Sequence, residues 1–353
     1  MAYTDIDKPT DYFETILYTG NGSSLEVNGL DFSPDWVWIK KRSNAANHMM
    51  YDTVRGIKKH LHTNTADIEV SEASDDIGLN SFDSDGFTVK VNGNTNTNTH
   101  TFASWNWKAG TSFTNDASST GIGSIDSAGS VNTDAGFSII GYTGDAQTGT
   151  TIAHGLGVKP NMIILKNREP DTANWQVYHS SLGATHYVQL NSTGAATDSN
   201  TRWNDVEPTS TVFTTGSSGD VCGDSSGETF IAYCFAEKQG YSKIGSYTGN
   251  GNADGPFVHT GFKPAWVLQK NAGATQGWQL QDNKREGYNG DNDLLQPHDS
   301  AAESGVNRID ILSNGFKVIT TDAGQNSSGV TYIYMAFAES PFVTSTGIPT
   351  TAR

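Results

Sequence analysis

The sequence predicts an all-β protein made of three tandem, jelly-roll-like antiparallel β-sandwich domains joined by short linkers. The first observation is a repeat: "YTGNG" at 18–22 returns at 247–251 and, as "YTGD", at 142–145. The second is the alternation of short β-branched and aromatic runs with Gly, Asn, Asp and Ser turns. The third is that no segment sustains a helical apolar period, since even 51–62 is interrupted by Gly56.

Landmarks after the repeated turn recur in the same order three times. The distance from the turn tyrosine to the aromatic that follows the Thr of the last strand is 84, 88 and 85 residues. Each unit also has a Pro six residues before a Lys, and then a Gly-Phe or Val-Phe strand start, at 86–87, 212–213 and 315–316. The tyrosine, proline and lysine landmarks are Tyr18, Pro34 and Lys40; Tyr142, Pro160 and Lys166; and Tyr247, Pro264 and Lys270. Such spacing indicates a tandem array of a module of roughly 100 residues.

These landmarks set the predicted boundaries. We expect an N-terminal arm at 1–11, repeat 1 at 12–110, repeat 2 at 137–238, repeat 3 at 241–342 and a polar tail at 343–353. The Ser/Gly-rich segment 111–136 reads as a linker, or alternatively as an extended segment lying on a neighbour. Each repeat is long enough to bury a core of its own, which favours three separate beads. The "YTGNG" stretch reads as the first hairpin turn of each bead, with its glycines serving backbone geometry.

The closing strand "TYIYMAFAE" at 331–339 shows which side chains share a face. Strict alternation separates two sets, and both are apolar enough for a strand covered on both sides. One set is Tyr332, Tyr334, Ala336 and Ala338, and the other is Ile333, Met335 and Phe337.

Composition excludes two classes of partner. The 353 residues carry 22 Lys and Arg against 38 Asp and Glu, a formal charge of −16. Nucleic acids and anionic membrane surfaces should both repel such a chain. No apolar run is long enough to span a bilayer. We therefore expect no nucleic-acid partner and no membrane insertion.

The sequence carries no catalytic or cofactor motif. The nine histidines do not fall in a zinc-binding arrangement, and "DSDG" at 83–86 lacks the later acidic ligand of a calcium loop. The phosphate-binding and nucleophile-elbow glycine patterns are missing too. We expect no enzyme, no cofactor and no metal. Cys222 and Cys234 are read as reduced thiols rather than a disulfide.

Aromatic residues are the candidate binding residues. Trp175 and Trp278 stand four residues before the polar landmarks His179 and Asp282, as His48 stands before Asp52, which favours a shared structural role over a binding platform. Trp203 and Tyr288 have no counterpart in the other repeats and lie in polar surroundings, so they are the better candidates for stacking on a sugar or packing on a partner. The tryptophans within strand patterns, with Phe337, are read as core: Trp36, Trp38, Trp105, Trp107 and Trp266.

Several longer strings resemble a repeated domain of unknown function that occurs in virion structural proteins of tailed, mostly marine, bacteriophages. They include "FSPDWVWIKKR", "GLGVKPNMIILK" and "GFKPAWV", and the resemblance extends from 12 to 342. It is weakest in repeat 2, where Gly-Phe becomes Val-Phe and the acidic landmark becomes His179. The resemblance implies a virion protein and supplies no catalytic residue.

Three functional hypotheses follow. The first is a non-enzymatic tail appendage or fibre component for host attachment. The second is a capsid decoration protein, in which three similar beads match a threefold environment. The third is a lectin-like carbohydrate-binding module. The expected partners are other virion proteins, further copies of the chain (a trimer) and a host-surface glycan, and the expected location is the virion surface.

Overall fold

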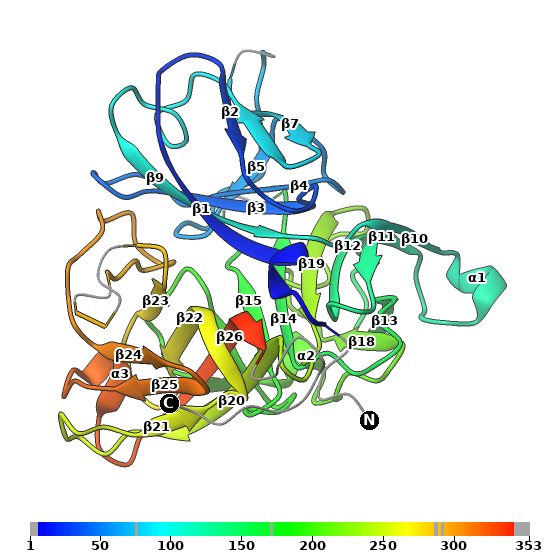
Figure 1. Cartoon of the computed structure of the whole chain (residues 1–353). Helices are drawn as coiled ribbons and strands as arrows, with labels where there is room; N and C mark the ends of the chain where they lie inside the picture. The colour runs from blue at the N-terminus through cyan, green and yellow to red at the C-terminus, as the bar shows by residue number, and fades with distance from the viewer. Residues whose placement is uncertain (1–5, 75–76, 170–171, 286–288, 291–292, 342–353) are drawn as a thin grey trace.

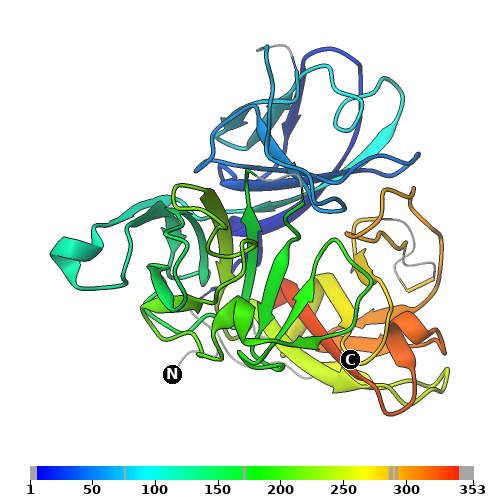
Figure 2. The same cartoon turned by 180° about the vertical axis from the view of Figure 1, so that it is seen from behind.

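A computed structural model describes residues 6–74, 77–169, 172–285, 289–290 and 293–341. These residues form antiparallel sheets with four very short helical segments, and the all-β prediction is confirmed. The helical segments are η1 (Pro9–Asp11), α1 (Ala117–Thr120), α2 (Asn200–Trp203) and α3 (Ala323–Asn326). Figures 1 and 2 show three sheet-containing bodies that meet at the centre of the molecule.

Repeat 1 has a large sheet in the order β1-β9-β3-β4-β5-β6 and a small sheet in the order β2-β8-β7. The large sheet comprises β1 (Phe13–Thr19), β9 (Thr101–Trp107), β3 (Trp36–Lys41), β4 (Met49–Asp52), β5 (Lys59–His62) and β6 (Val70–Ser71). The small sheet comprises β2 (Leu25–Asn28), β8 (Gly86–Val89) and β7 (Leu79–Asp83). The first strands alternate between sheets as in a jelly roll, but β3, β4, β5 and β6 then run on as a meander.

Repeats 2 and 3 preserve this order around a central strand. The large sheet of repeat 2 comprises, in spatial order, β10 (Thr111–Asn115), β11 (Ser127–Asn132), β12 (Phe137–Thr143), β19 (Thr229–Phe235), β14 (Met162–Asn167), β15 (Gln176–His179), β16 (His186–Gln189) and β17 (Thr197–Asp198). That of repeat 3 comprises β20 (Ser242–Thr248), β26 (Thr331–Pro341), β22 (Phe262–Asn271) and β23 (Trp278–Asp282). The small sheets are β13 (Thr150–Ala153) with β18 (Val212–Thr215), and β21 (Phe257–His259) with β25 (Gly315–Val318) and β24 (Ile309–Leu312). The strand starts predicted at Gly86, Val212 and Gly315 are confirmed.

The hydrophobic core corrects the expectation of three separate beads. One continuous cluster takes buried side chains from all three large sheets, including Trp36, Tyr233 and Trp266. The opposite face of each large sheet packs on its own small sheet around a separate cluster. The two faces predicted for the last strand are confirmed, because Ile333 points to the shared core while Tyr332 points to the cluster of repeat 3. Separate burial fails as a prediction because each large sheet is apolar on both faces.

Residues 111–132 also differ from the prediction of a linker. They form the strands β10 and β11 around α1, and both strands extend the large sheet of repeat 2 beyond β12. Serine, threonine and glycine are compatible with a strand at an exposed sheet margin, so composition alone did not separate the two states.

The repeated turn is not a hairpin. After β1 the chain passes from the large to the small sheet, since β1 pairs with β9 and β2 pairs with β8. The first glycine of each turn lies against the loop before the central strand: a Cβ on Gly20 would lie 2.3 Å from the Thr97 oxygen, and one on Gly249 would lie 2.3 Å from the Ser327 oxygen. The preceding tyrosine binds the same loop, with Tyr18 donating to the Thr95 carbonyl at 2.7 Å. Tyr142 and Tyr247 make the equivalent bonds to Val221 and Gln325.

Candidate functional site

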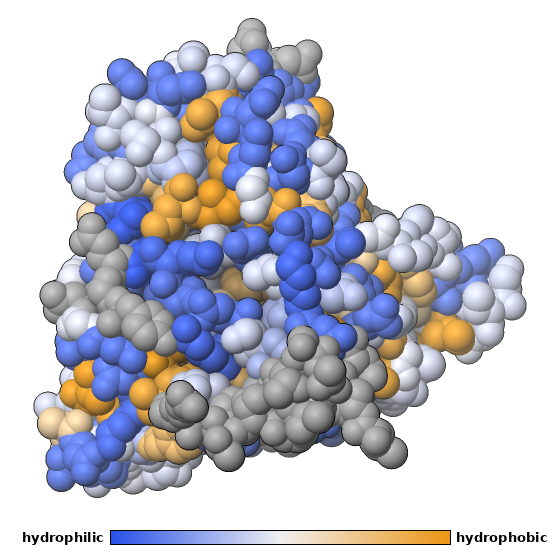
Figure 3. All heavy atoms as spheres, in the orientation of Figure 1, coloured by the Kyte–Doolittle hydropathy of each residue, from blue (hydrophilic) through white to orange (hydrophobic). Residues whose placement is uncertain are grey.

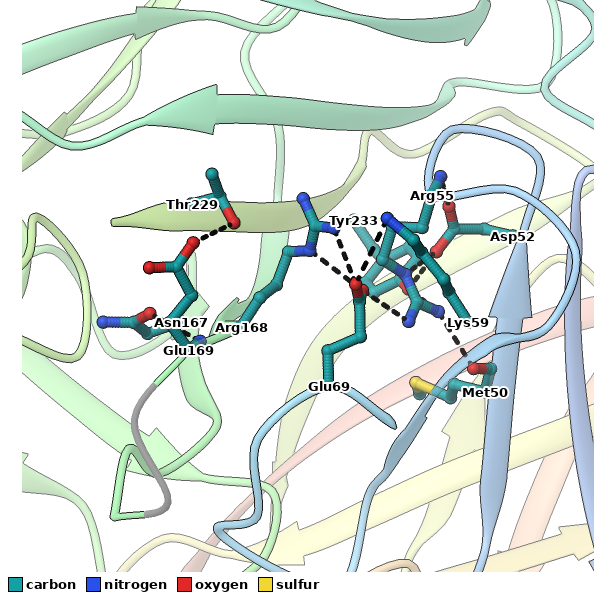
Figure 4. A network of polar contacts seen from close by, with 10 residues as sticks. All are labelled: Met50, Asp52, Arg55, Lys59, Glu69, Asn167, Arg168, Glu169, Thr229 and Tyr233. Carbon is teal, nitrogen blue, oxygen red and sulfur yellow. Dashed lines mark hydrogen bonds and ion pairs between the residues drawn. The ribbon is translucent and has the colours of Figure 1, made fainter. Parts of the chain in front are cut away.

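The junction between repeats 1 and 2 holds a buried ion pair. Asp52 ends β4, and three residues later Arg55 folds back so that its Nε lies 2.5 Å from Oδ2 of Asp52. Both side chains are fully buried. Tyr233, on the central strand of repeat 2, donates its hydroxyl to the same carboxylate oxygen at 2.7 Å (Figure 4). The strand end of one repeat therefore binds the central strand of the next.

Glu69 bridges two arginines, Arg55 and Arg168, across the same junction. It accepts from Arg55 at 3.3 Å and from Arg168 of repeat 2 at 2.9 and 2.7 Å (Figure 4). Burial alone would raise the pKa of Glu69, but the bonds from Arg168 and the charge of Arg55 outweigh it and lower the pKa. Glu69 is therefore held as a carboxylate between two guanidinium groups.

The junction between repeats 3 and 1 repeats this arrangement. Asp282 ends β23, and Arg285 Nε lies 2.6 Å from its Oδ2. Trp105, the central-strand residue of repeat 1, donates its indole N–H to Asp282 at 2.9 Å. Glu303 then bridges Arg285 at 2.9 Å and Arg42 at 2.7 Å.

At the junction between repeats 2 and 3, a histidine and apolar residues occupy the same places. His179 stands where the aspartates are, and its Nε2 donates to the Tyr334 carbonyl at 3.2 Å. Met335 takes the place of Trp105 and Tyr233, because each is the fifth residue of its strand counted from the first threonine. The methionine side chain has no hydrogen-bond donor. The other charged positions are apolar as well: Leu182 for arginine, Ala196 for glutamate and Ala272 for the neighbouring arginine. The same backbone hydrogen bond at both junctions shows that Ala196 and Ala272 correspond to Glu69 and Arg168. Ala196 N donates to the Ala272 oxygen, as Glu69 N donates to the Arg168 oxygen.

The three landmark lysines bind across the same junctions. Each ammonium group donates to a backbone carbonyl of the preceding repeat in the ring: Lys166 to Ala66 at 3.0 Å, Lys270 to Thr193 at 3.1 Å and Lys40 to Ser300 at 3.2 Å. Burial lowers the pKa of Lys40 and of Lys270 to about 8. These contacts connect repeat 1 to repeat 2, repeat 2 to repeat 3 and repeat 3 to repeat 1, so the repeats form a closed ring.

Trp175 and Trp278 have the structural role that their spacing favoured. Trp175 donates its indole N–H to the His62 carbonyl of repeat 1 at 2.8 Å, and Trp278 donates to the Gln189 carbonyl of repeat 2 at 2.8 Å. Both are buried, and His48 lies beside Gln296 at the corresponding position. Neither indole presents a face to solvent for a ligand.

Trp203 is a correction to the predicted ligand-binding pair. It lies at the end of α2 with 2 % of its surface exposed and packs edge-on against Tyr178, with ring centroids 6.0 Å apart. Its polar neighbours in sequence are exposed or half-buried, which hid its burial. Tyr288, the other member of the pair, lies outside the described residues.

Sequence reasoning missed the ion pairs. The signal was present as an Asp followed three residues later by an Arg at both Asp52 and Asp282. This spacing was not recognised as an ion pair because the composition of the two segments does not indicate that they are buried. The two cysteines are free and buried, which confirms reduced thiols, and Cys222 donates its S–H to Asp145 at 3.2 Å.

Open hollows border the β10–β11 extension. One, of about 630 Å³, lies along this extension and the neighbouring strands of repeat 2, and its border includes Asp116, Asp126 and Arg168. Among the described residues, no group of three or more His, Cys, Asp or Glu side chains could hold a metal ion. Within the same residues, no helix is long and apolar enough to cross a membrane.

Comparison with known proteins gives one family. No curated protein matches the chain. Residues 8–341, which contain all three repeats and the β10–β11 extension, match the family described as "Domain of unknown function (DUF7483)". The match therefore spans all three repeats that contribute to the shared core. The chain belongs to the DUF7483 family.

Proposed function

We propose that this chain is a non-enzymatic structural protein of a tailed phage, carried on the virion surface as part of a tail appendage that contacts the host. The observation that carries the proposal is the closed ring of repeats around one aromatic core. Such a body turns three related outer faces toward its surroundings and keeps its own interior filled. The resemblance to virion proteins supports the same assignment.

A rigid body suits this role because an appendage transmits force and survives outside the cell. The buried pairs Asp52–Arg55 and Asp282–Arg285 hold neighbouring repeats in one orientation. Activity would then reside in surface contacts with the particle and with the host. In Figure 3 the coloured surface is mostly hydrophilic or of intermediate hydropathy, and the hydrophobic residues gather mainly on the upper part of the molecule.

Capsid decoration is the second candidate, and the ring itself favours it. A single chain with three equivalent positions can sit on a threefold or quasi-threefold site of a shell without forming a trimer. The lectin alternative lost part of its basis, because Trp203 is buried.

The copy number per particle tests these assignments. Quantitative mass spectrometry of purified virions, with the major capsid protein as the reference, measures it directly. A few dozen copies or fewer supports the tail appendage, and immunogold labelling should then mark the tail. A ratio near that of the capsid protein supports decoration and contradicts the appendage. Absence from purified virions overturns both.

A further inference from the structure

Strand β10 is an open sheet edge with unusual composition. It is the outermost strand of the large sheet of repeat 2, and in the described part of the chain β11 is its one strand neighbour. An edge strand leaves alternate N–H and C=O groups free to pair with another chain, and proteins usually protect such edges with charges, prolines or very short strands. The sequence Thr-Ser-Phe-Thr-Asn at 111–115 has none of these protections.

The other edges of the large sheets are protected. β1 carries Glu14, which pairs with Lys284 at 3.5 Å, and β20 carries Lys243, which pairs with Glu237 at 2.9 Å. β6 and β17 are two residues long, and every residue of β23 is buried. The unprotected edge is thus confined to the extension that repeat 2 adds and that the other repeats lack.

Hollows on both faces of β10 leave room for the side chains of an added strand. On one face, Ser112 and Thr114 line a hollow of about 410 Å³ together with Val54. On the other, Phe113 and Ile122 line a mostly apolar hollow of about 200 Å³. Ile122 is 38 % exposed on the arm that carries α1, which stands out from the body in Figure 3. Strand addition needs free backbone groups for affinity and room for alternate side chains for specificity, and both are present here.

We propose that β10 pairs antiparallel with β10 of a second copy of this chain, about a two-fold axis through Phe113. In this register Ser112 faces the partner's Thr114 and Phe113 faces the partner's Phe113, so a hydroxyl pair and an aromatic pair face each other. The ends are also complementary in charge, because Lys108 precedes the strand and Asp116 follows it. Within the described residues, the Asp116 carboxylate makes no ion pair and accepts hydrogen bonds from Ser118 and Ser119. This inference is independent of the proposed function.

The first test is the molar mass of the purified full chain in solution. Sedimentation equilibrium over a concentration series should give a reversible monomer–dimer equilibrium. Salt should strengthen association, since each copy carries a formal charge of −16. A monomer at every concentration, at low and high salt, overturns the proposal and leaves β10 to a strand of a different protein.

Charge variants test the register. The pair Ser112→Lys with Thr114→Lys places like charges opposite each other twice across the two-fold axis and should weaken association by about tenfold or more. The pair Ser112→Lys with Thr114→Glu places opposite charges there and should restore association to within about threefold of the original. Ser246→Lys, on the edge strand β20, is the matched control and should leave the association constant unchanged. Each variant should keep its near-ultraviolet circular dichroism. A dimer that is indifferent to both pairs overturns the proposal.

Discussion

At the scale of single residues, the three junctions are alternative solutions to one packing problem. Two junctions bury an Asp–Arg pair beneath an aromatic donor, Tyr233 or Trp105. The third buries His179 against a backbone carbonyl and replaces the remaining charges with apolar side chains. Burying ions is costly unless every partner is present, so the charged members must change together.

Removing one member of the charged set should be much worse than exchanging the whole set. Arg55→Leu leaves Asp52 buried without its cation and should lower the free energy of unfolding by about 3–5 kcal/mol. Converting the junction to the apolar solution, with Asp52→His, Arg55→Leu, Glu69→Ala, Arg168→Ala and Tyr233→Met, should cost less than the sum of the single changes. Urea unfolding measures both. Additive losses would contradict the equivalence of the junctions.

Acid should weaken the junction between repeats 2 and 3. Burial lowers the pKa of His179 to about 4, and its Nδ1 accepts from Ser181 N at 3.2 Å, so protonation would break that bond. The unfolded chain binds the proton near the ordinary pKa of about 6.5. The stability that neutral His179 contributes is therefore lost as pH falls from about 6.5 toward about 4. His179→Gln should unfold with a weaker dependence on pH over this range. An equal dependence of the unfolding free energy on pH in the original chain and the variant would contradict this role of His179.

At the scale of elements, the order of strands was predictable and their partners were not. The landmarks correctly placed the central strands and the starts of β8, β18 and β25. The "YTGNG" stretch at 18–22 was wrong as a hairpin turn, because local chemistry specifies a tight bend but not whether the next strand joins the same sheet. The β10–β11 strands were missed because side chains such as Ser112 and Gly129 indicate a flexible linker equally well.

The glycine after the turn tyrosine should be required for packing rather than for flexibility. A Cβ on Gly20 would lie 2.3 Å from the Thr97 oxygen, so Gly20→Ala should lower the free energy of unfolding by about 1–3 kcal/mol. Gly93→Ala is the matched control, since nothing lies within 4 Å of its added Cβ, and it should change the free energy by less than about 0.5 kcal/mol. Thermal or urea unfolding compares the two. Equal effects would show that the close approach is unimportant.

At the scale of the whole molecule, the repeat sequence predicted the three units but not their closure into one. Each large sheet is apolar on both faces, which is compatible with a sandwich buried between its own layers or with a ring around a common core. The distinguishing residues are those of the strand ends, such as Asp52 and Asp282, whose aromatic partners across the junction lie more than 170 residues away in sequence. Long-range pairing of this kind is not encoded in local spacing. The ligand-binding role predicted for Trp203 was wrong, because this side chain is buried.

Calorimetric unfolding of the full chain tests the shared core most directly. A ring of repeats with one core should unfold in a single transition, with calorimetric and van't Hoff enthalpies equal within error. Three resolved transitions, or a van't Hoff enthalpy near one third of the calorimetric value, would mean that the repeats unfold as independent beads and would contradict the closed ring.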